Sequence, residues 1–231
     1  MNKNNSFLFA LVPFLLFGCA SKPQTPVDLN LSEAVPQSTR VAVAAPALPK
    51  VNTFFPGAGC LLCIAIAEGN HSALTKHTQA LPPEGLSQIK DEIAALLREQ
   101  GAEVTVVEEP LDLGKLPKAS NKTEESAKLD FTGLKQRFQV DKLVVVNITA
   151  LGMQRAYAAY VPQGAPRAIF KGEGFMVDLN DNSYEWYRQI DLGREAEGGW
   201  DEPPSFPGLT NAYFQVLDEG REAYLVPFRT K

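Results

Sequence analysis

The chain has 231 residues, of which 45% are hydrophobic and 21% charged, and its formal net charge is −5. These values suit one folded domain with tails and exclude a fully disordered or fibrous chain. Net acidity without a dense Lys/Arg run argues against nucleic acid as a partner, because that binding depends on neutralising phosphates. The apolar runs stay below about 18 residues, so we expect no membrane-spanning helix in the mature chain.

The amino-terminal residues have the layout of a bacterial secretory signal. Lys3 and the amino group supply positive charge, residues 6–17 form a short apolar core, and Cys19 follows. Residues 1–18 are therefore interpreted as a signal peptide that is removed on export. The run Leu16-Phe17-Gly18-Cys19 resembles the lipobox of bacterial lipoproteins, although Phe17 stands where that family usually has a small residue.

This resemblance implies that Cys19 becomes the first residue of the mature chain and carries three acyl chains of the palmitate type. Three chains at ~0.8 kcal/mol per buried CH₂ give a stable anchor. Ala20 and Ser21 follow the cysteine, which in the enterobacterial sorting pattern implies the outer membrane. We expect a lipid-anchored protein that faces the periplasm. An uncleaved anchor, or an ordinary signal with an incidental cysteine, is the alternative.

The mature chain divides into a tether and one domain. Residues 19–39 are polar, contain proline and lack a sustained period, which is typical of a flexible lipidated tether. A single domain is expected over residues 40–231. It opens with a strand over residues 40–45, and an all-round apolar run over residues 59–67 follows. The clearest helix covers residues 84–100, with its apolar side chains on one face.

The second half of the chain reads mainly as strands. A strand over residues 102–107 precedes a loop and a short helix that ends at Phe138. Residues 143–148 are almost continuously apolar, which predicts a central strand covered on both faces.

Three alternating segments then follow, over residues 153–161, 167–179 and 184–192, before a last helix. Residues 162–166 and 180–182 join these segments as hairpin connections, so we expect an antiparallel meander.

Helical crossovers join parallel strands, whereas hairpins join antiparallel ones. The order of elements therefore predicts an α/β fold with an α+β tendency: a mixed sheet with helices packed on it and an antiparallel C-terminal meander. Over about residues 40–230 this order resembles, in topology only, the periplasmic domains of the TolB amino-terminal type, curli-secretion lipoproteins and penicillin-binding-protein activator lipoproteins. The resemblance implies a periplasmic domain and says little about activity.

Cys60 and Cys63 are the sharpest candidate for chemistry. The periplasm is oxidising, so the pair is a disulfide candidate. A catalytic Cys-x-x-Cys pair lies at a helix N-terminus, where the dipole lowers the pKa of the first thiol. The inner Leu-Leu pair differs from the Gly-Pro or Pro-His of thioredoxin-like enzymes. A metal site would have to recruit His71 or His77, which are expected at the surface. Neither a metal nor a cofactor is predicted.

Aromatic side chains are candidate partner-binding residues, because exposed aromatics anchor interfaces. Trp200 lies in a Gly/Pro loop and is the best of them, followed by Trp186 and Tyr187 on the meander, where half-buried core is the competing interpretation. The apolar stretch over residues 54–67 packs in the core, meets a partner or oligomer surface, or dips into the membrane.

The sequence contains no G-x-S-x-G turn, no P-loop and no G-x-G-x-x-G after a strand, and no catalytic residue is assigned. We predict an outer-membrane lipoprotein with a non-catalytic periplasmic binding or assembly domain that serves envelope maintenance, secretion or cell-wall machinery. Its partners would be the membrane, through the lipid, and an envelope protein or further copies of the chain. One alternative is a thiol–disulfide oxidoreductase using Cys60 and Cys63. Another is a ring- or pore-forming envelope subunit, suggested by the long meander strands.

Overall fold

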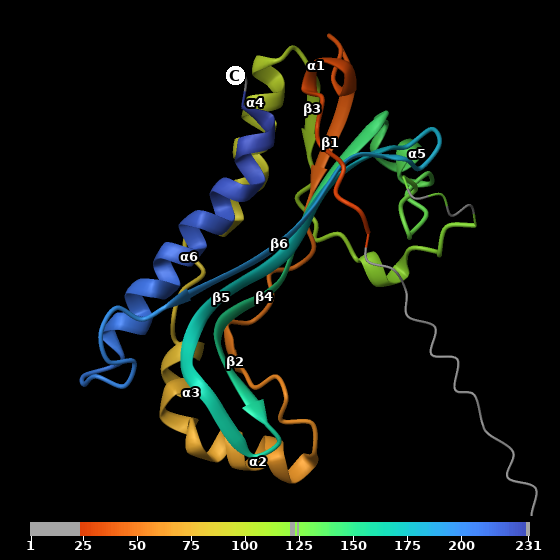
Figure 1. Cartoon of the computed structure of the whole chain (residues 1–231). Helices are drawn as coiled ribbons and strands as arrows, with labels where there is room; N and C mark the ends of the chain where they lie inside the picture. Colours follow the sequence, from red (N-terminus) through yellow and green to blue (C-terminus); the bar gives the residue numbers. More distant parts are fainter. Residues whose placement is uncertain (1–23, 121–122, 124, 230–231) are drawn as a thin grey trace, which may run out of the picture.

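A computed structural model describes residues 24–120, 123 and 125–229. Within these residues six strands form one mixed sheet with helices packed against it (Figure 1), which confirms the predicted fold class. The predicted signal peptide and the lipidation site Cys19 lie outside the described residues.

The strands are β1 (Arg40–Ala44), β2 (Asn52–Phe54), β3 (Glu103–Val106), β4 (Lys142–Ala158), β5 (Val161–Asp178) and β6 (Tyr184–Glu195). The α-helices are α1 (Leu31–Ala34), α2 (Leu61–Asn70), α3 (Ser72–Gln79), α4 (Ile89–Glu99), α5 (Leu134–Phe138) and α6 (Pro207–Leu225). Short 3₁₀ helices are η1 (Leu86–Gln88), η2 (Leu113–Lys115) and η3 (Val226–Phe228).

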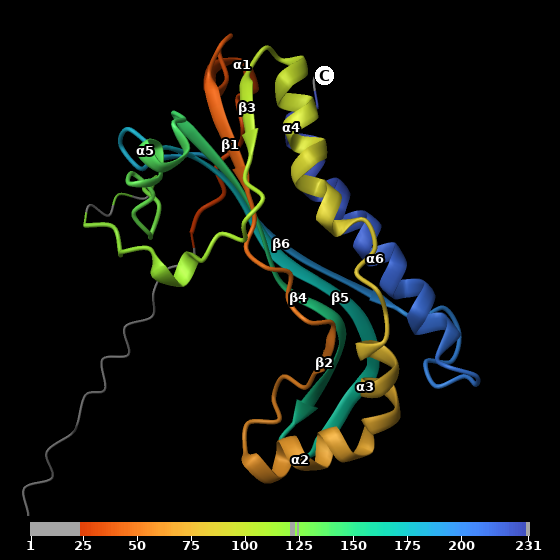
Figure 2. The same ribbon diagram turned by 180° about the vertical axis from the view of Figure 1, so that it is seen from behind.

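The sheet order is β3-β1-β4-β5-β6, with β2 paired to β4 off this path. β1 runs parallel to β3 and β4, and β4, β5 and β6 are successively antiparallel. β1 pairs with Lys142–Val145 of β4, whereas β2 pairs farther along, with Gly152–Gln154. The β4–β5 hairpin therefore extends beyond the rest of the sheet and carries a second lobe made of β2, α2 and α3 (Figure 2).

Two cores hold the main part of the sheet. α4 and α6 cover one face, where Ile93, Leu97 and Tyr213 are 0% exposed. α5 and the loop before it cover the other face over Phe131 and Phe175. The predicted helix over residues 84–100 is observed as η1 followed by α4, because its apolar side chains recur at helical spacing against the sheet.

The meander differs from the prediction in its first turn. The hairpin turns at Ala159 and Tyr160, and the segment 162–166 lies inside β5 instead of connecting two strands. The predicted strands over residues 143–148 and 153–161 are parts of one strand, β4, with register shifts between Ile148 and Ala150 and again between Gln154 and Ala156. The prolines of the segment 162–166 are tolerated in β5 because β5 pairs with β6 only from Arg167 onward. Their missing amide N–H therefore breaks no hydrogen bond to β6.

The amino-terminal segment also differs from a free tether in its described part. Val27 exchanges two backbone hydrogen bonds of 2.9 Å with Tyr187 of β6. Ala34 and Val35 are 5% and 4% exposed and belong to the main core. The packed domain thus begins before Arg40. A single bridge and a four-residue helix produce no periodic pattern, so the sequence carried no signal for them.

Candidate functional site: an apolar tip

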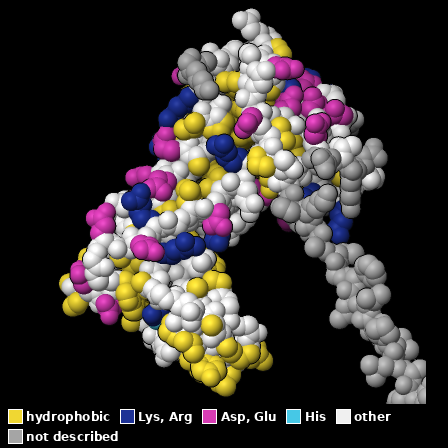
Figure 3. Space-filling view, viewed as in Figure 1, with side chains coloured by type: hydrophobic (Ala, Val, Ile, Leu, Met, Phe, Trp, Pro, Cys, Tyr) yellow, Lys and Arg dark blue, Asp and Glu magenta, His cyan; other side chains and the backbone are white. Residues whose placement is uncertain are grey.

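Five of the seven large hydrophobic side chains that are exposed among the described residues gather at the end of the second lobe. We define the apolar tip as Leu61, Leu62 and Ile64 of α2 together with Tyr160 and Val161 at the β4–β5 turn. Their exposed fractions are 90%, 70%, 39%, 63% and 48%. Figure 3 shows hydrophobic surface covering the end of the molecule where α2 lies. Exposed apolar patches of this kind mark contact sites with proteins or membranes.

The amino-acid pattern of α2 explains why its apolar side chains reach the surface. From Leu61 to Ala67 the helix is apolar on every side, but only the side with Cys63 and Ala67 faces the hairpin, where both residues pack with Tyr157. Ile64 and the residues before Cys63 therefore point away from this small core. Of the three alternatives for residues 54–67, packing in the core holds for Cys63 and Ala67 but not for Leu61 and Leu62 in the first turn.

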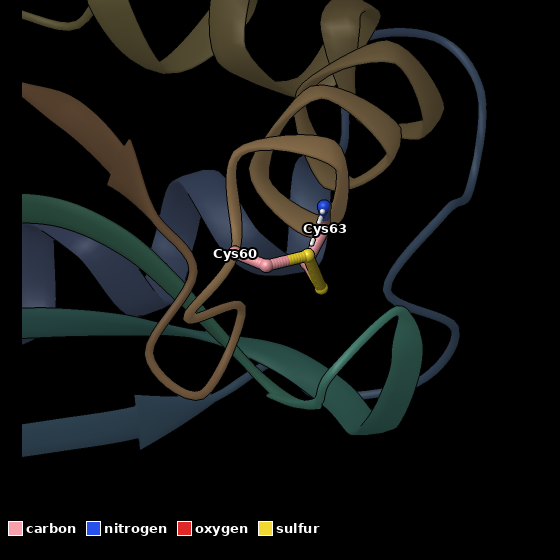
Figure 4. The surroundings of a disulfide bond; sticks show 2 residues. All are labelled: Cys60 and Cys63. Atoms are coloured by element: carbon pink, nitrogen blue, oxygen red, sulfur yellow. Dashed lines mark hydrogen bonds between the residues drawn. A yellow bond between two sulfur atoms is a disulfide. The ribbon is translucent and has the colours of Figure 1, made fainter.

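A disulfide joins Cys60 and Cys63 at the start of α2 (Figure 4). Cys60 is the exposed N-cap residue, and Cys63 is 6% exposed. The amide of Cys63 donates a hydrogen bond of 3.0 Å to Sγ of Cys60. Leu61 and Leu62 are enclosed between the two cysteines, so the covalent ring holds the two most exposed leucines of the tip in one short turn.

Close backbone packing fixes α2 to the hairpin. The amide of Tyr157 donates a 2.8 Å hydrogen bond to the carbonyl of Pro56. Gly57 has a φ of +88°, and a Cβ placed on it would lie 1.9 Å from the carbonyl oxygen of Tyr157. Only glycine fits this contact without displacing the backbone. Phe55 completes the packing with its ring edge-to-face on Tyr157 at 5.8 Å.

An aromatic cluster behind the tip joins it to the loop that precedes α6. His71 stacks on Phe55 at 5.5 Å and meets Trp200 edge-on at 6.0 Å. The guanidinium of Arg155 lies 5.0 Å from the centre of the Trp200 ring, and Trp200 stacks on Phe206 at 6.4 Å. Trp200, the best sequence candidate for partner binding, is thus half-buried and in contact with its own chain.

The other two aromatic candidates lie inside the domain. Trp186 is 2% exposed and packs edge-on against Phe228 at 5.1 Å. Tyr187 is 7% exposed, its hydroxyl donates to Glu173 at 3.0 Å, and burial raises its pKa. Consecutive strand residues face opposite sides of a sheet, and here helices or loops cover both sides. Trp186 and Tyr187 therefore agree with the competing interpretation, a position in the core, and neither offers an exposed surface for a partner.

The histidines also depart from expectation. His71 is 5% exposed, and burial followed by the charge of Arg155 lowers its pKa. His77 is half-buried, contacts the Thr210 hydroxyl at 2.8 Å, and has its pKa lowered by burial. In the part of the chain that the structure describes, no group of three or more His, Cys, Asp or Glu residues could hold a metal.

The same described residues contain no helix that is long and apolar enough to cross a bilayer.

No family model and no curated protein matches the sequence. Matching solved structures include a PelC dodecamer from Paraburkholderia phytofirmans, with 8% identity over 89% of this chain and 96% of that chain and a TM-score of 0.32. Protein XCC0632 from Xanthomonas campestris is 13% identical over 87% of this chain and 91% of that chain, with a TM-score of 0.39. Lipoprotein GNA1162 from Neisseria meningitidis is 11% identical over 78% of this chain and 96% of that chain, with a TM-score of 0.27. At these TM-scores the likeness assigns no activity and no partner to this chain.

Proposed function

We propose that the chain is an outer-membrane lipoprotein, anchored through Cys19, whose periplasm-facing domain is a non-catalytic binding or assembly module. The observation that carries the proposal is the apolar tip, a surface of exposed leucine, isoleucine, tyrosine and valine built on a covalently closed turn. A module that holds an envelope component near a membrane needs an anchor and a contact surface. The lipobox resemblance supports the anchor, and the tip supports the contact surface.

The anchor is tested on the full-length chain expressed in a Gram-negative host. Mass spectrometry of the mature protein is expected to show three acyl chains on Cys19. Membrane fractionation is expected to show that the protein sediments with the outer membrane. Cys19→Ser is expected to leave the signal peptide uncleaved and the lipid absent. An unmodified Cys19 in protein from the soluble periplasmic fraction would overturn the anchor.

The contact surface is tested with a photo-crosslinking amino acid at Leu62 in intact cells. The matched control carries the same amino acid at Val226, which is 53% exposed and lies at the C-terminal end of α6, away from α2 (Figure 1). We expect a reproducible adduct from Leu62 and none from Val226. Equal labelling at the two positions, or none at either, would remove the tip as a contact surface.

A second candidate, a thiol–disulfide oxidoreductase, is favoured by one observation. Cys60 is exposed at the N-terminus of α2 with Cys63 behind it, which is where reactive Cys-x-x-Cys pairs lie. Turnover in an insulin-reduction assay that is lost in Cys60→Ser would support this activity, and its absence in the wild type would end it. In a glutathione titration, a potential below about −300 mV would mark a structural disulfide, and one between about −120 and −270 mV a labile pair.

A further inference from the structure

The two segments that build the apolar tip carry no charge. Residues 51–67 and 156–166 contain no Asp, Glu, Lys, Arg or His. Interfaces between soluble proteins usually have a polar rim around their apolar centre. A side chain that enters hydrocarbon, by contrast, must be uncharged, because burying a charge in a bilayer is costly. Two charge-free segments meeting at one end of the molecule therefore match a lipid surface.

The size of the tip limits how deep it can go. α2 has 10 residues and so is about 15 Å long, whereas the hydrocarbon core of a bilayer is about 30 Å thick. Short apolar surfaces of this kind enter the boundary between headgroups and acyl chains, about 5–10 Å deep. Tyr160, 63% exposed at the hairpin turn, combines an apolar ring with a hydroxyl, as residues at this boundary do.

The position of the lipid keeps the domain beside the bilayer. Five residue steps separate Cys19 from Gln24, the first described residue, and they span at most ~18 Å when extended. An anchor this close raises the effective concentration of the bilayer around the domain, so a second weak contact becomes favourable.

We propose that the apolar tip is a second membrane contact, with Leu61 and Leu62 inserted into the phospholipid leaflet that holds the acyl chains of Cys19. This inference rests on the proposed lipid anchor and names the bilayer as the component that the tip contacts. The disulfide keeps the two leucines together in the turn that enters the lipid. Two attachments, one covalent lipid and one apolar tip, then fix how the domain faces the membrane.

The test uses depth-dependent quenching of tryptophan fluorescence in the full-length lipidated protein. Leu62→Trp, and Val226→Trp as the matched control, are reconstituted in phosphatidylethanolamine–phosphatidylglycerol vesicles with and without brominated acyl chains. We expect the Leu62→Trp emission to shift to shorter wavelength and to lose intensity with brominated lipid. The Val226→Trp emission is expected to match the wild type, whose own tryptophans, Trp186 and Trp200, give a constant background.

Co-sedimentation with the vesicles reports the anchor separately. If the protein sediments but Leu62→Trp is not quenched more than Val226→Trp, membrane insertion is overturned and the anchor stands. A blue shift that depends on protein concentration and ignores brominated lipid would assign the tip to a second copy of the chain, which also overturns the inference. If Cys19 is unmodified, the same comparison at saturating vesicles decides for or against insertion. Tyr160→Trp replaces Leu62→Trp if circular dichroism shows that the latter does not fold.

Discussion

The guanidinium of Arg155 donates a hydrogen bond of 3.1 Å from Nη1 to Nε2 of His71. A guanidinium has no acceptor, so this ring nitrogen must be unprotonated and the imidazole neutral, with its proton on Nδ1. The contact joins β4 to the junction of α2 and α3, directly behind the apolar tip. Protonation of His71 would remove the acceptor and place two positive charges side by side.

Stability is therefore expected to depend on pH. Burial lowers the pKa of both His71 and His77 below the ordinary value of 6.5. As the pH falls through 6.5, the two histidines bind protons in the unfolded chain but stay neutral in the folded chain. The free energy of unfolding therefore decreases. Above that pH both states are neutral at these residues and the effect is absent. Urea unfolding between about pH 7.5 and 5.5 measures the decrease.

The control is the double variant His71→Gln/His77→Gln. Its glutamine amides cannot titrate, so we expect the free energy of unfolding to vary less across this pH range than in the wild type. Identical pH profiles for the two proteins would contradict the assignment of the effect to the histidines.

Gly57→Ala tests the backbone contact between α2 and the hairpin. The new Cβ would lie 1.9 Å from the carbonyl oxygen of Tyr157 and would sit at a φ of +88°. We expect a loss of roughly 2–4 kcal/mol in the free energy of unfolding. Gly59→Ala is the matched control two residues on, because nothing lies within 4 Å of its Cβ position. Equal denaturation midpoints for both variants would contradict the described contact.

Removal of the disulfide is expected to have a moderate effect. Cys60 and Cys63 close a very short loop, for which the chain-entropy relation gives roughly 2 kcal/mol. The variant Cys60→Ser/Cys63→Ser should lose about this amount in urea unfolding. Wild-type protein treated with a phosphine reductant should behave in the same way, and a reductant effect that persists in the double variant would show that another group is responsible.

The ion pair between Glu92 of α4 and Arg221 of α6 should contribute little. Their side chains are 31% and 34% exposed, and half-exposed pairs contribute at most ~1 kcal/mol. Glu92→Gln is therefore expected to cost less than that in the free energy of unfolding. Ile93→Ala, at the next position but 0% exposed, should cost about 2–5 kcal/mol. A larger effect of Glu92→Gln than of Ile93→Ala would contradict this ranking.

The elements that the sequence predicted well are those with a strong period. The helix over residues 84–100 has apolar side chains every three or four positions, and the strand at 143–148 is apolar throughout. Regular patterns of this length favour one type of element. Residues 84–100 are accordingly mostly helical, as η1 and α4, and residues 143–148 lie in the first half of β4, which continues to Ala158.

The first hairpin turn had no such signal. Ala159 and Tyr160 are not turn-forming residues, and Ala159 adopts a φ of +55° at the tip of the hairpin. The prolines and glycine at residues 162–166 are strong turn signals, but β5 accommodates them where it has no partner in β6. The position of the turn is set by the pairing of β4 with β5 along their whole length. The residues near the turn do not by themselves determine that pairing.

Most of the candidate site was beyond prediction for a related reason. Hydropathy marked residues 54–67 as apolar but could not tell which side of the helix the hairpin would cover. Exposure of Leu61 and Leu62 follows from the orientation of α2 on Tyr157, a contact between residues about a hundred positions apart in the chain. The Cys-x-x-Cys spacing and the apolar composition of residues 54–67 were the local signals that pointed to this place.

The bridge between Val27 and Tyr187 has a mechanical consequence. Tension applied at the amino end reaches two backbone hydrogen bonds at the sheet edge before it reaches any other strand. Behind them, the buried side chains of Ala34 and Val35 would have to leave the core for the segment to peel away. A force on the amino end of the described segment is thus transmitted into β6 itself, and from Val27 onward this segment would move together with the sheet.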